Sequence, residues 1–252
     1  MLSKFRRKIN ENIPLSLLRL RYGPYVFECP ICGYRGLFTE KESSSGKRKH
    51  ALCPRCYASE RHRLQSLVLN QVIEEMDVRK SKVLHFAPEH FFQKLFSSTF
   101  DSYDTADLYM ENVDYNVDLT NLPFPDKSYN LVFASHVLEH IADDKKAISE
   151  VRRILKPGGI AILPVPIVSN ETIEYEKPIP TEENHVRAPG LDYFDRYAEF
   201  FSRVEIKASD SFPSKYQLYV WEDRSIWPTA NYPMRKPMNG EKHLDFVPIC
   251  FL

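Results

Sequence analysis

Short apolar runs alternate with helix-forming segments between residues 81 and 167, and this alternation limits the fold more than any other feature. Strands separated by helices build βαβ units around a parallel sheet. We therefore expect an α/β fold with a Rossmann-like sheet and helices on both of its faces. The expected strands are SKVLHF (81–86), DSYDTADLY (101–109), NVDYNVDLT (112–120), YNLVFAS (129–135) and GIAILPVPI (159–167), and the expected helices are HFFQKLFSS (90–98) and AISEVRRIL (147–155).

Two further features concern the limits of this sheet. KPGG (156–159) combines proline and glycine and is expected to end the helix before it. FSRVEIKAS (201–209) and YQLYVWED (216–223) are expected as two final strands that pair at the sheet edge.

Ligands of open parallel sheets bind beyond the carboxyl ends of the strands, near the switch in strand order. The predicted ligand loops are therefore residues 86–90, 107–110, 118–122 and 135–140.

Four of the five cysteines form two C-x-x-C pairs, Cys29/Cys32 and Cys53/Cys56. Each pair can direct two thiolates at one cation, and two pairs complete a tetrahedral shell of four thiolates. A closed shell leaves no position for a catalytic water, so we predict a structural Zn²⁺. An iron–sulfur centre or a pair of redox thiols is the alternative. Cys250 stands alone and is expected to be a packed thiol.

Charge is distributed unevenly, although the formal net charge is zero. Residues 1–80 contain sixteen Lys and Arg but eight Asp and Glu. A basic region of this kind contacts phosphates or forms a solvated charged face. The basic residues in and next to the cysteine region are Lys47, Arg48, Lys49, Arg55, Arg61 and Arg63.

No run of apolar residues is long enough to span a membrane, and MLSKFRRKIN lacks the apolar region of a signal peptide. We therefore expect no membrane contact and a cytoplasmic protein.

The sequence patterns divide the chain into five expected segments. The segments are a basic leader (1–24), a four-cysteine zinc ribbon (25–58), a connecting helix (59–80), the Rossmann-like domain (81–223) and a C-terminal extension (224–252).

The stretch VDLTNLPFPDKSYNLVFASHVLEHI, followed by AISEVRRILKPGGIAILPVP, resembles class I S-adenosylmethionine (SAM)-dependent methyltransferases of the type 11 group. With the four-cysteine unit ahead of it, the chain resembles those members that carry an N-terminal zinc ribbon. The resemblance implies a methyltransferase with a class I sheet that uses SAM and releases S-adenosylhomocysteine (SAH).

The resemblance also implies a cofactor site. In the family an acidic residue after the second strand holds the ribose, and Asp107 occupies this place. Asp118, with the backbone of Leu119, stands where the adenine amino group is bound. The cofactor-binding residues implied are Phe86, Ala87, Pro88, Glu89, Asp107, Leu108, Asp118, Leu119, Ser135 and His136.

The first cofactor loop departs from the family pattern. The family has Asp-x-Gly-x-Gly, whereas this chain has His85-Phe86-Ala87-Pro88-Glu89. Glycines let a backbone approach a ligand closely, so their absence reshapes this contact. We hypothesise that Glu89 binds the cofactor ammonium in place of the missing carboxylate. An inactive relative that binds no cofactor is the alternative.

Three histidines, His136, His140 and His185, are the candidate proton acceptors, because imidazole accepts a proton near neutral pH.

The expected acceptor of the methyl group is a small hydroxylated metabolite or a sugar-like compound. Ribosomal or transfer RNA is the alternative, since ribosomal RNA guanine methyltransferases also join a zinc unit to this fold. A non-catalytic zinc-ribbon binding protein is the third reading. Residues 136–140 also match the H-x-x-E-H pattern of metalloproteases, but His136 directly follows a strand, which disfavours a site within one helix.

Overall fold

The computed structural model describes residues 13–43 and 46–252. Residues 1–12, half of the expected basic leader, therefore lie outside the described part of the chain. The first described helix, α2 (Leu15–Tyr22), begins directly after Pro14. Among the described residues no helix is long and apolar enough to cross a membrane.

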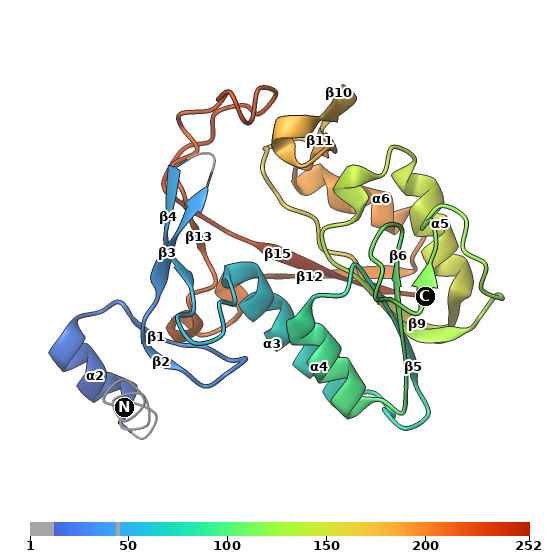
Figure 1. The fold of residues 1–252 in the computed structure, drawn as a ribbon, viewed down its shortest axis with the longest axis horizontal. Coiled ribbons are helices and arrows are strands. Elements are labelled where there is room, and N and C mark those ends of the chain that lie inside the picture. The colour runs from blue at the N-terminus through green and yellow to red at the C-terminus, as the bar shows by residue number, and fades with distance from the viewer. Residues whose placement is uncertain (1–12, 44–45) are drawn as a thin grey trace.

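A seven-stranded sheet forms the centre of the molecule, in the order β12-β15-β9-β8-β5-β6-β7 (Figure 1). The strands from β9 to β7 pair in parallel, whereas β15 runs antiparallel to both of its neighbours. The bounds are β5 (Lys82–Phe86), β6 (Ser102–Asp107), β7 (Tyr115–Asn116), β8 (Tyr129–Ala134), β9 (Leu155–Ile162), β12 (Arg203–Ala208) and β15 (Phe246–Phe251). The expected α/β fold with a parallel sheet is confirmed.

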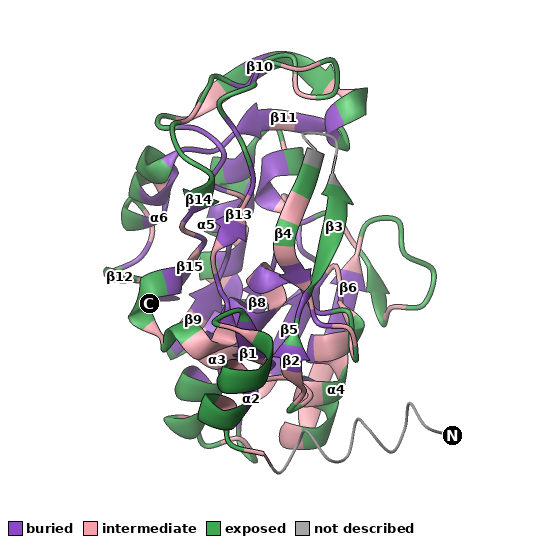
Figure 2. Cartoon of the chain, turned by 90° about the vertical axis from the view of Figure 1, so that its left-hand side faces the viewer, coloured by how far each residue is buried: buried purple, intermediate pink, exposed green. Residues whose placement is uncertain are grey.

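Helices cover both faces of this sheet, also as expected. Because successive side chains of a strand point to opposite faces, Leu84 and Val132 face one core while Val83 and Leu131 face the other. The first core contains α5 (Asp144–Ile154) and α6 (Asp195–Ala198), and the second contains α3 (Glu60–Glu74) and α4 (His90–Thr99). Figure 2 shows the buried strands between the more exposed helices. Helix α3 is thus part of the core rather than only a connection.

The C-terminal extension expected at residues 224–252 is not separate from the sheet. Its last six-residue strand, β15 (FVPICF), is inserted between β9 and β12. A continuous apolar run is typical of a strand buried on both faces. The expected pairing of 201–209 with 216–223 is therefore wrong, because β12 pairs with β15 instead.

The segment 216–223 belongs to a second sheet. Only Val220–Trp221 (β13) is a strand there, and it joins β14 (Lys242–His243) to β4 (Gly46–Leu52) and β3 (Thr39–Ser43). The polar middle of the cysteine region forms the β3–β4 hairpin. In β4 the exposed Lys47 and Lys49 alternate with the less exposed Arg48 and His50, which suits a sheet with solvent on one face.

The helix before KPGG ends close to where it was expected to, but KPGG does not form its cap. Helix α5 ends at Ile154, and KPGG lies inside β9. Gly158 adopts a φ of 74°, and the pairing of β8 with β9 shifts between Tyr129 and Leu131. The glycine thus absorbs an irregularity in a strand, since it adopts positive φ without a steric penalty.

Candidate functional site

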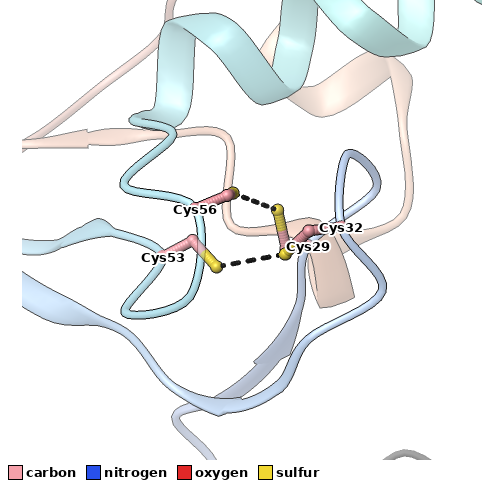
Figure 3. A group of neighbouring side chains, drawn as sticks. All are labelled: Cys29, Cys32, Cys53 and Cys56. Atoms are coloured by element: carbon pink, nitrogen blue, oxygen red, sulfur yellow. Dashed lines mark hydrogen bonds between the residues drawn. The ribbon is translucent and has the colours of Figure 1, made fainter. Parts of the chain in front are cut away.

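The four paired cysteines lie together, although 20 residues separate the two pairs. The Sγ atoms of Cys29 and Cys56 are 3.6 Å apart, as are those of Cys32 and Cys53, and all four atoms lie within 4.8 Å of one another (Figure 3). Tetrahedral zinc with Zn–S bonds of about 2.3 Å places its sulfur atoms about 3.8 Å apart. The spacing suits a shared cation and is too long for a disulfide.

Both cysteine pairs have the same backbone turn. The Gly33 N–H donates to the Cys29 carbonyl, and the Tyr57 N–H donates to the Cys53 carbonyl. Gly33 and Tyr57 have φ values of 70° and 63°, so both adopt the left-handed conformation. This repeated turn directs both thiols of a pair to the same side.

A cavity of about 520 Å³ lies beyond the carboxyl ends of β5 and β8. These strands mark the switch point, because the chain order runs outward from β5 to β6 and β7 on one side and to β8 and β9 on the other. Ala87 and Ser135, which follow β5 and β8, line it. Its other walls come from the β3–β4 hairpin, from the turn between β10 (Ile173–Ile179) and β11 (His185–Ala188), and from residues 220–245.

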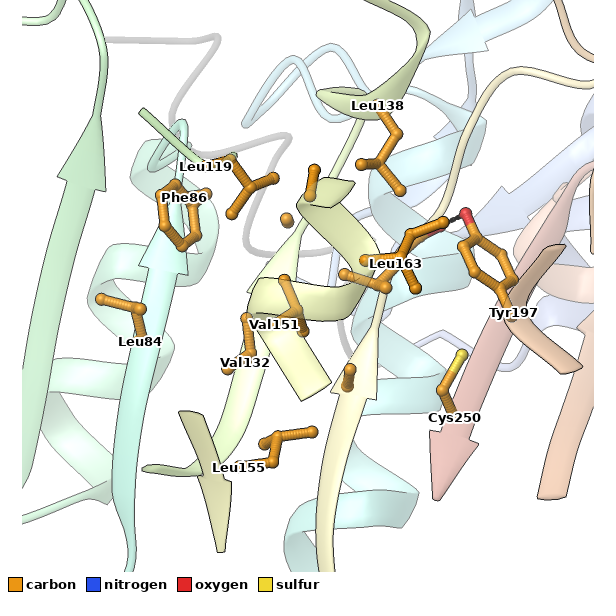
Figure 4. Packing of buried hydrophobic residues seen from close by; sticks show 14 of the residues in the cluster. Leu84, Phe86, Leu119, Val132, Leu138, Val151, Leu155, Leu163, Tyr197 and Cys250 are labelled. Atoms are coloured by element: carbon orange, nitrogen blue, oxygen red, sulfur yellow. Dashed lines mark hydrogen bonds between the residues drawn. The ribbon is translucent and has the colours of Figure 1, made fainter. Parts of the chain in front are cut away.

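The loop after β5 adopts a glycine-like conformation without a glycine. Ala87 has a φ of 47°, and its N–H donates to the Ala106 carbonyl at 2.9 Å. A left-handed alanine costs about 1–2 kcal/mol, so the surrounding packing holds this backbone in place. The ring of Phe86 and the side chain of Leu119 pack in the core, which leaves only their backbone for a ligand (Figure 4). Pro88 is also buried.

Glu89 is held by two side chains of α3. Its Oε1 accepts from Arg61 at 2.8 Å and lies 2.9 Å from Nε2 of His62. Burial opposes ionisation, but the hydrogen bond and charge of His62 and the charge of Arg61 outweigh it and lower the pKa of Glu89 to about 2. The second oxygen, Oε2, is buried without a hydrogen-bond partner. An ionised carboxylate with one buried, unpaired oxygen therefore lies in the wall of this cavity.

Asp107 and Asp118 both shape their own loops. Oδ1 of Asp107 accepts from the N–H groups of Tyr109 and Met110, and Oδ1 of Asp118 accepts from the N–H and hydroxyl of Thr120. Neither aspartate lines the cavity, and Asp118 is exposed. Leu108, the other residue expected here, is 47% exposed.

Ser135 and His136 lie at the end of β8. The Ser135 hydroxyl donates to Oε1 of Gln65 at 3.2 Å, which ties the strand end to α3. His136 has a φ of 56°, and its N–H donates to the Pro164 carbonyl. The following residues, Leu138–His140, form a 3-10 helix (η1), so His136 and His140 do not share a continuous helix. The geometry of a metalloprotease helix is absent here, as expected.

His140 and His185, predicted as alternative bases, lie side by side. Their ring centroids are 4.7 Å apart, and Glu139 lies beside them. Burial lowers the pKa of His185 to about 4. Burial alone would raise the pKa of Glu139, but His136, His140 and His185 hold it below its ordinary value. Glu139 is not among the site residues expected from the sequence.

His85 occupies the place of the family's aspartate and is fully buried. Its Nδ1 is hydrogen-bonded to the Tyr103 hydroxyl at 3.0 Å, and its Nε2 has no partner. The rings of Phe96 and Phe133 lie beside it, with centroids 5.3 and 5.1 Å away. Burial lowers the pKa of His85 to about 3. This histidine is a neutral core residue rather than a cofactor ligand.

Stability should therefore decrease in acid through His85. The unfolded pKa is about 6.5 and the folded pKa is about 3, so the unfolded chain binds more protons between these values. The contribution of His85 to the free energy of unfolding is complete above pH 6.5. It is lost as the pH falls, by about 2 kcal/mol at pH 5. Urea unfolding of wild type and His85→Phe at pH 7.5 and pH 5 measures this. Between pH 7.5 and pH 5, the free energy of unfolding of His85→Phe should fall by about 2 kcal/mol less than that of the wild type. Equal losses in the two proteins would contradict the prediction.

Known methyltransferases resemble part of this chain in sequence. The sequence model of a family described as a methyltransferase domain matches residues 98–163. The chain is 29% identical over 106 residues to a ubiquinone/menaquinone biosynthesis C-methyltransferase of Pseudoalteromonas translucida, covering 42% of this chain and 37% of that protein. It is 28% identical over 124 residues to a demethylmenaquinone methyltransferase of Staphylococcus epidermidis, covering 49% of this chain and 42% of that protein.

A solved structure shares the fold. An S-adenosylmethionine-dependent methyltransferase from Mesorhizobium loti is similar with a TM-score of 0.50 at 12% identity, over 75% of this chain and 98% of that one. The shared fold confirms the expected Rossmann-like sheet, and the sequence matches show a similarity to methyltransferase domains that includes residues 98–163. The chain spans less than half the length of these two curated relatives.

Proposed function

We propose that this protein transfers a methyl group from SAM to a small, polar, hydroxyl-bearing acceptor bound in the cavity beyond β5 and β8. The observation that carries the proposal is the buried, unpaired Oε2 of Glu89 at the switch point of the sheet. A buried ionised oxygen without a partner is costly unless a ligand supplies a donor. The ammonium group of SAM is such a donor.

We assign the remaining contacts with the cofactor to residues at and beside this cavity. The left-handed backbone at Ala87 gives the loop the shape that glycine gives it in the family. Asp107 and Asp118 each use one oxygen to order their loops, and each has a second carboxylate oxygen for the ribose and the adenine respectively. The backbone of Leu119 and of Ser135 would complete the contacts. When bound, SAM supplies an electrophilic methyl group, and the chain's task is to align acceptor and cofactor.

Charge in the cavity favours a polar acceptor. Twelve of the 24 described residues that line it are Lys, Arg, Asp or Glu. The volume suits a small molecule, since such pockets span about 300–1,000 Å³. The curated relatives are named for quinone substrates, which are largely apolar, whereas this lining suits a hydroxylated metabolite or a sugar-like compound. His136, His140 and His185 line the same cavity and are the candidate proton acceptors.

RNA is the less favoured acceptor, because the basic residues around the cysteines are already engaged. Arg48 is paired with Glu60, Lys49 with Glu241, and Lys47 lies near Glu40 and Glu42. Arg61 binds Glu89, Arg63 is fully buried, and Arg55 donates to the Cys32 carbonyl. Phosphate binding needs cations that are available to neutralise it.

We propose that residues 25–58 bind a structural Zn²⁺ through Cys29, Cys32, Cys53 and Cys56. The four converging thiols support this, and a closed shell of four thiolates leaves no position for substrate. We also propose that the Rossmann-like domain, expected at residues 81–223, includes α3 and extends through β15.

Calorimetry with SAH tests the function and the role of Glu89. A Glu89→Gln variant keeps the size of the side chain and can still accept from Arg61 and His62, but it loses the charge. A lost charge-assisted hydrogen bond is worth about 1.5–3 kcal/mol, so SAH should bind about 10–100-fold more weakly.

Glu75→Gln, at the exposed end of α3, is the matched control and should bind SAH like the wild type. Unchanged affinity in Glu89→Gln would remove Glu89 from the cofactor site. If the wild type releases no heat at millimolar SAH, the methyltransferase proposal fails.

A further inference from the structure

Glu139 is a fully buried carboxylate that accepts no hydrogen bond. Its exposed fraction is 0%, and both of its oxygens lack a hydrogen-bond partner among the described residues. His136 Nδ1 lies 3.3 Å from Oε1, which is an ion-pair distance without hydrogen-bond geometry. A buried carboxylate normally has several donors, so this arrangement calls for a cation.

Two histidines present nitrogen atoms to the same point. Ligand atoms of Glu139, His140 and His185 all lie within 4.8 Å of one another. His185 comes from the start of β11, 45 residues beyond His140 in the chain. Its Nδ1 is also buried without a hydrogen-bond partner, with Oε1 of Glu182 at 3.9 Å. Two unpaired groups from separate elements thus meet in the cavity wall.

We infer that Glu139, His140 and His185 bind a divalent transition-metal cation. Two imidazoles and one carboxylate suit zinc, manganese or iron better than magnesium or calcium, which prefer oxygen ligands. Three protein ligands leave coordination positions open, as in catalytic zinc sites. The site is distinct from the four-cysteine centre, whose thiols close the shell.

The turn that carries two of the ligands is held rigidly by Arg187 of β11. The guanidinium is buried and donates to the carbonyls of Leu138 at 2.7 Å, Ile141 at 2.6 Å and Ala142 at 3.0 Å. Its Nε donates to Glu174. Metal sites need ligands fixed by surrounding hydrogen bonds, and Arg187 supplies them for this turn.

The cation would also define the acceptor, which is a step that rests on the proposed function. Glu139, His140 and His185 line the same cavity as Ala87, Glu89 and Ser135. An open position on a divalent cation binds an oxygen donor and favours its ionised form. The acceptor class is therefore a molecule that presents a hydroxyl oxygen to the metal. His136 would then remain as the proton acceptor, because His140 and His185 use their nitrogen lone pairs for the metal.

Cation binding by the full, zinc-loaded chain tests the inference. Mn²⁺ is added and the free ion is followed by electron paramagnetic resonance, since Mn²⁺ competes poorly for thiolates. Binding of a second equivalent of Zn²⁺ is measured in parallel by equilibrium dialysis. We expect one saturable site for these ions besides the four-cysteine centre.

His140→Gln is the decisive variant, because His140 is exposed and its replacement does not disturb the core. We expect its affinity to fall about 10–100-fold, as in Glu139→Gln and His185→Gln, whereas His90→Gln, an exposed histidine of α4, keeps wild-type affinity. Absence of both Mn²⁺ and second-site Zn²⁺ binding, or undiminished binding in His140→Gln, overturns the inference.

SAH calorimetry without added metal separates the two proposals. If SAH binds but no cation site is found, only the metal inference fails. If a cation site is found but SAH does not bind, only the proposed function fails.

Discussion

A Cys53→Ser variant should lose the Zn²⁺ that we propose for the paired cysteines, and with it a large part of its stability. Structural zinc contributes about 10–16 kcal/mol of binding free energy at pH 7, which is larger than the net stability of a typical domain. The cluster around the cysteines contains few other buried residues, Phe27, Phe38 and Ala58, so it has little apolar core of its own. We expect cooperative unfolding of residues 25–58 and a lower melting temperature for the whole chain.

Metal analysis and thermal unfolding measure this prediction. Substitution of zinc by Co²⁺ should give a thiolate charge-transfer band in the wild type that Cys53→Ser lacks. Cys250→Ala is the control, because Cys250 lies in the sheet core and should leave the band unchanged. A Cys53→Ser protein with an undiminished melting temperature would show that the metal is not what holds this region together.

An Arg63→Met variant should be destabilised by about 3–5 kcal/mol, since it removes a buried charge and leaves its partners unsatisfied. Arg63 is fully buried on α3. Its Nη1 donates to the carbonyls of Ala51 at 2.9 Å and Ala58 at 2.7 Å, and its Nη2 donates to the carbonyl of Gln217 at 2.6 Å. One guanidinium thus joins the cysteine region, α3 and the segment before β13.

Urea unfolding measures the loss, with Arg79→Leu as the control because Arg79 is exposed beyond α3. Arg63→Lys should fall between wild type and Arg63→Met, since an ammonium has fewer donors and no planar fork. The effects of Arg63→Met and Cys53→Ser should not add, because unfolding of the cysteine region already removes two of the carbonyl partners. Full additivity, or a loss below about 1 kcal/mol, would contradict this role for Arg63.

The sequence was most informative where a local pattern decides the structure. Alternation of apolar runs predicted the strands β5, β6 and β8 and the helix α4 within a few residues. The strand β15 was missed because FVPICF lies beyond a long irregular stretch, and nothing local shows which neighbours it pairs with. The helix end before KPGG was predicted, but the strand through KPGG was missed, because the same residues suit a helix end and an irregular strand.

The features of the candidate site also fall into two groups, those predicted from local sequence and those that only the tertiary structure shows. The sequence alone determined the parallel strands of the sheet, the two C-x-x-C pairs and the loops at the strand ends, because hydrophobic period and ligand spacing act over a few neighbouring residues. Only the tertiary structure decided that Arg61 and His62 of α3 hold Glu89, and that His185 reaches Glu139 and His140. Those contacts depend on how helices and hairpins pack across the sheet, and packing is a property of the whole chain.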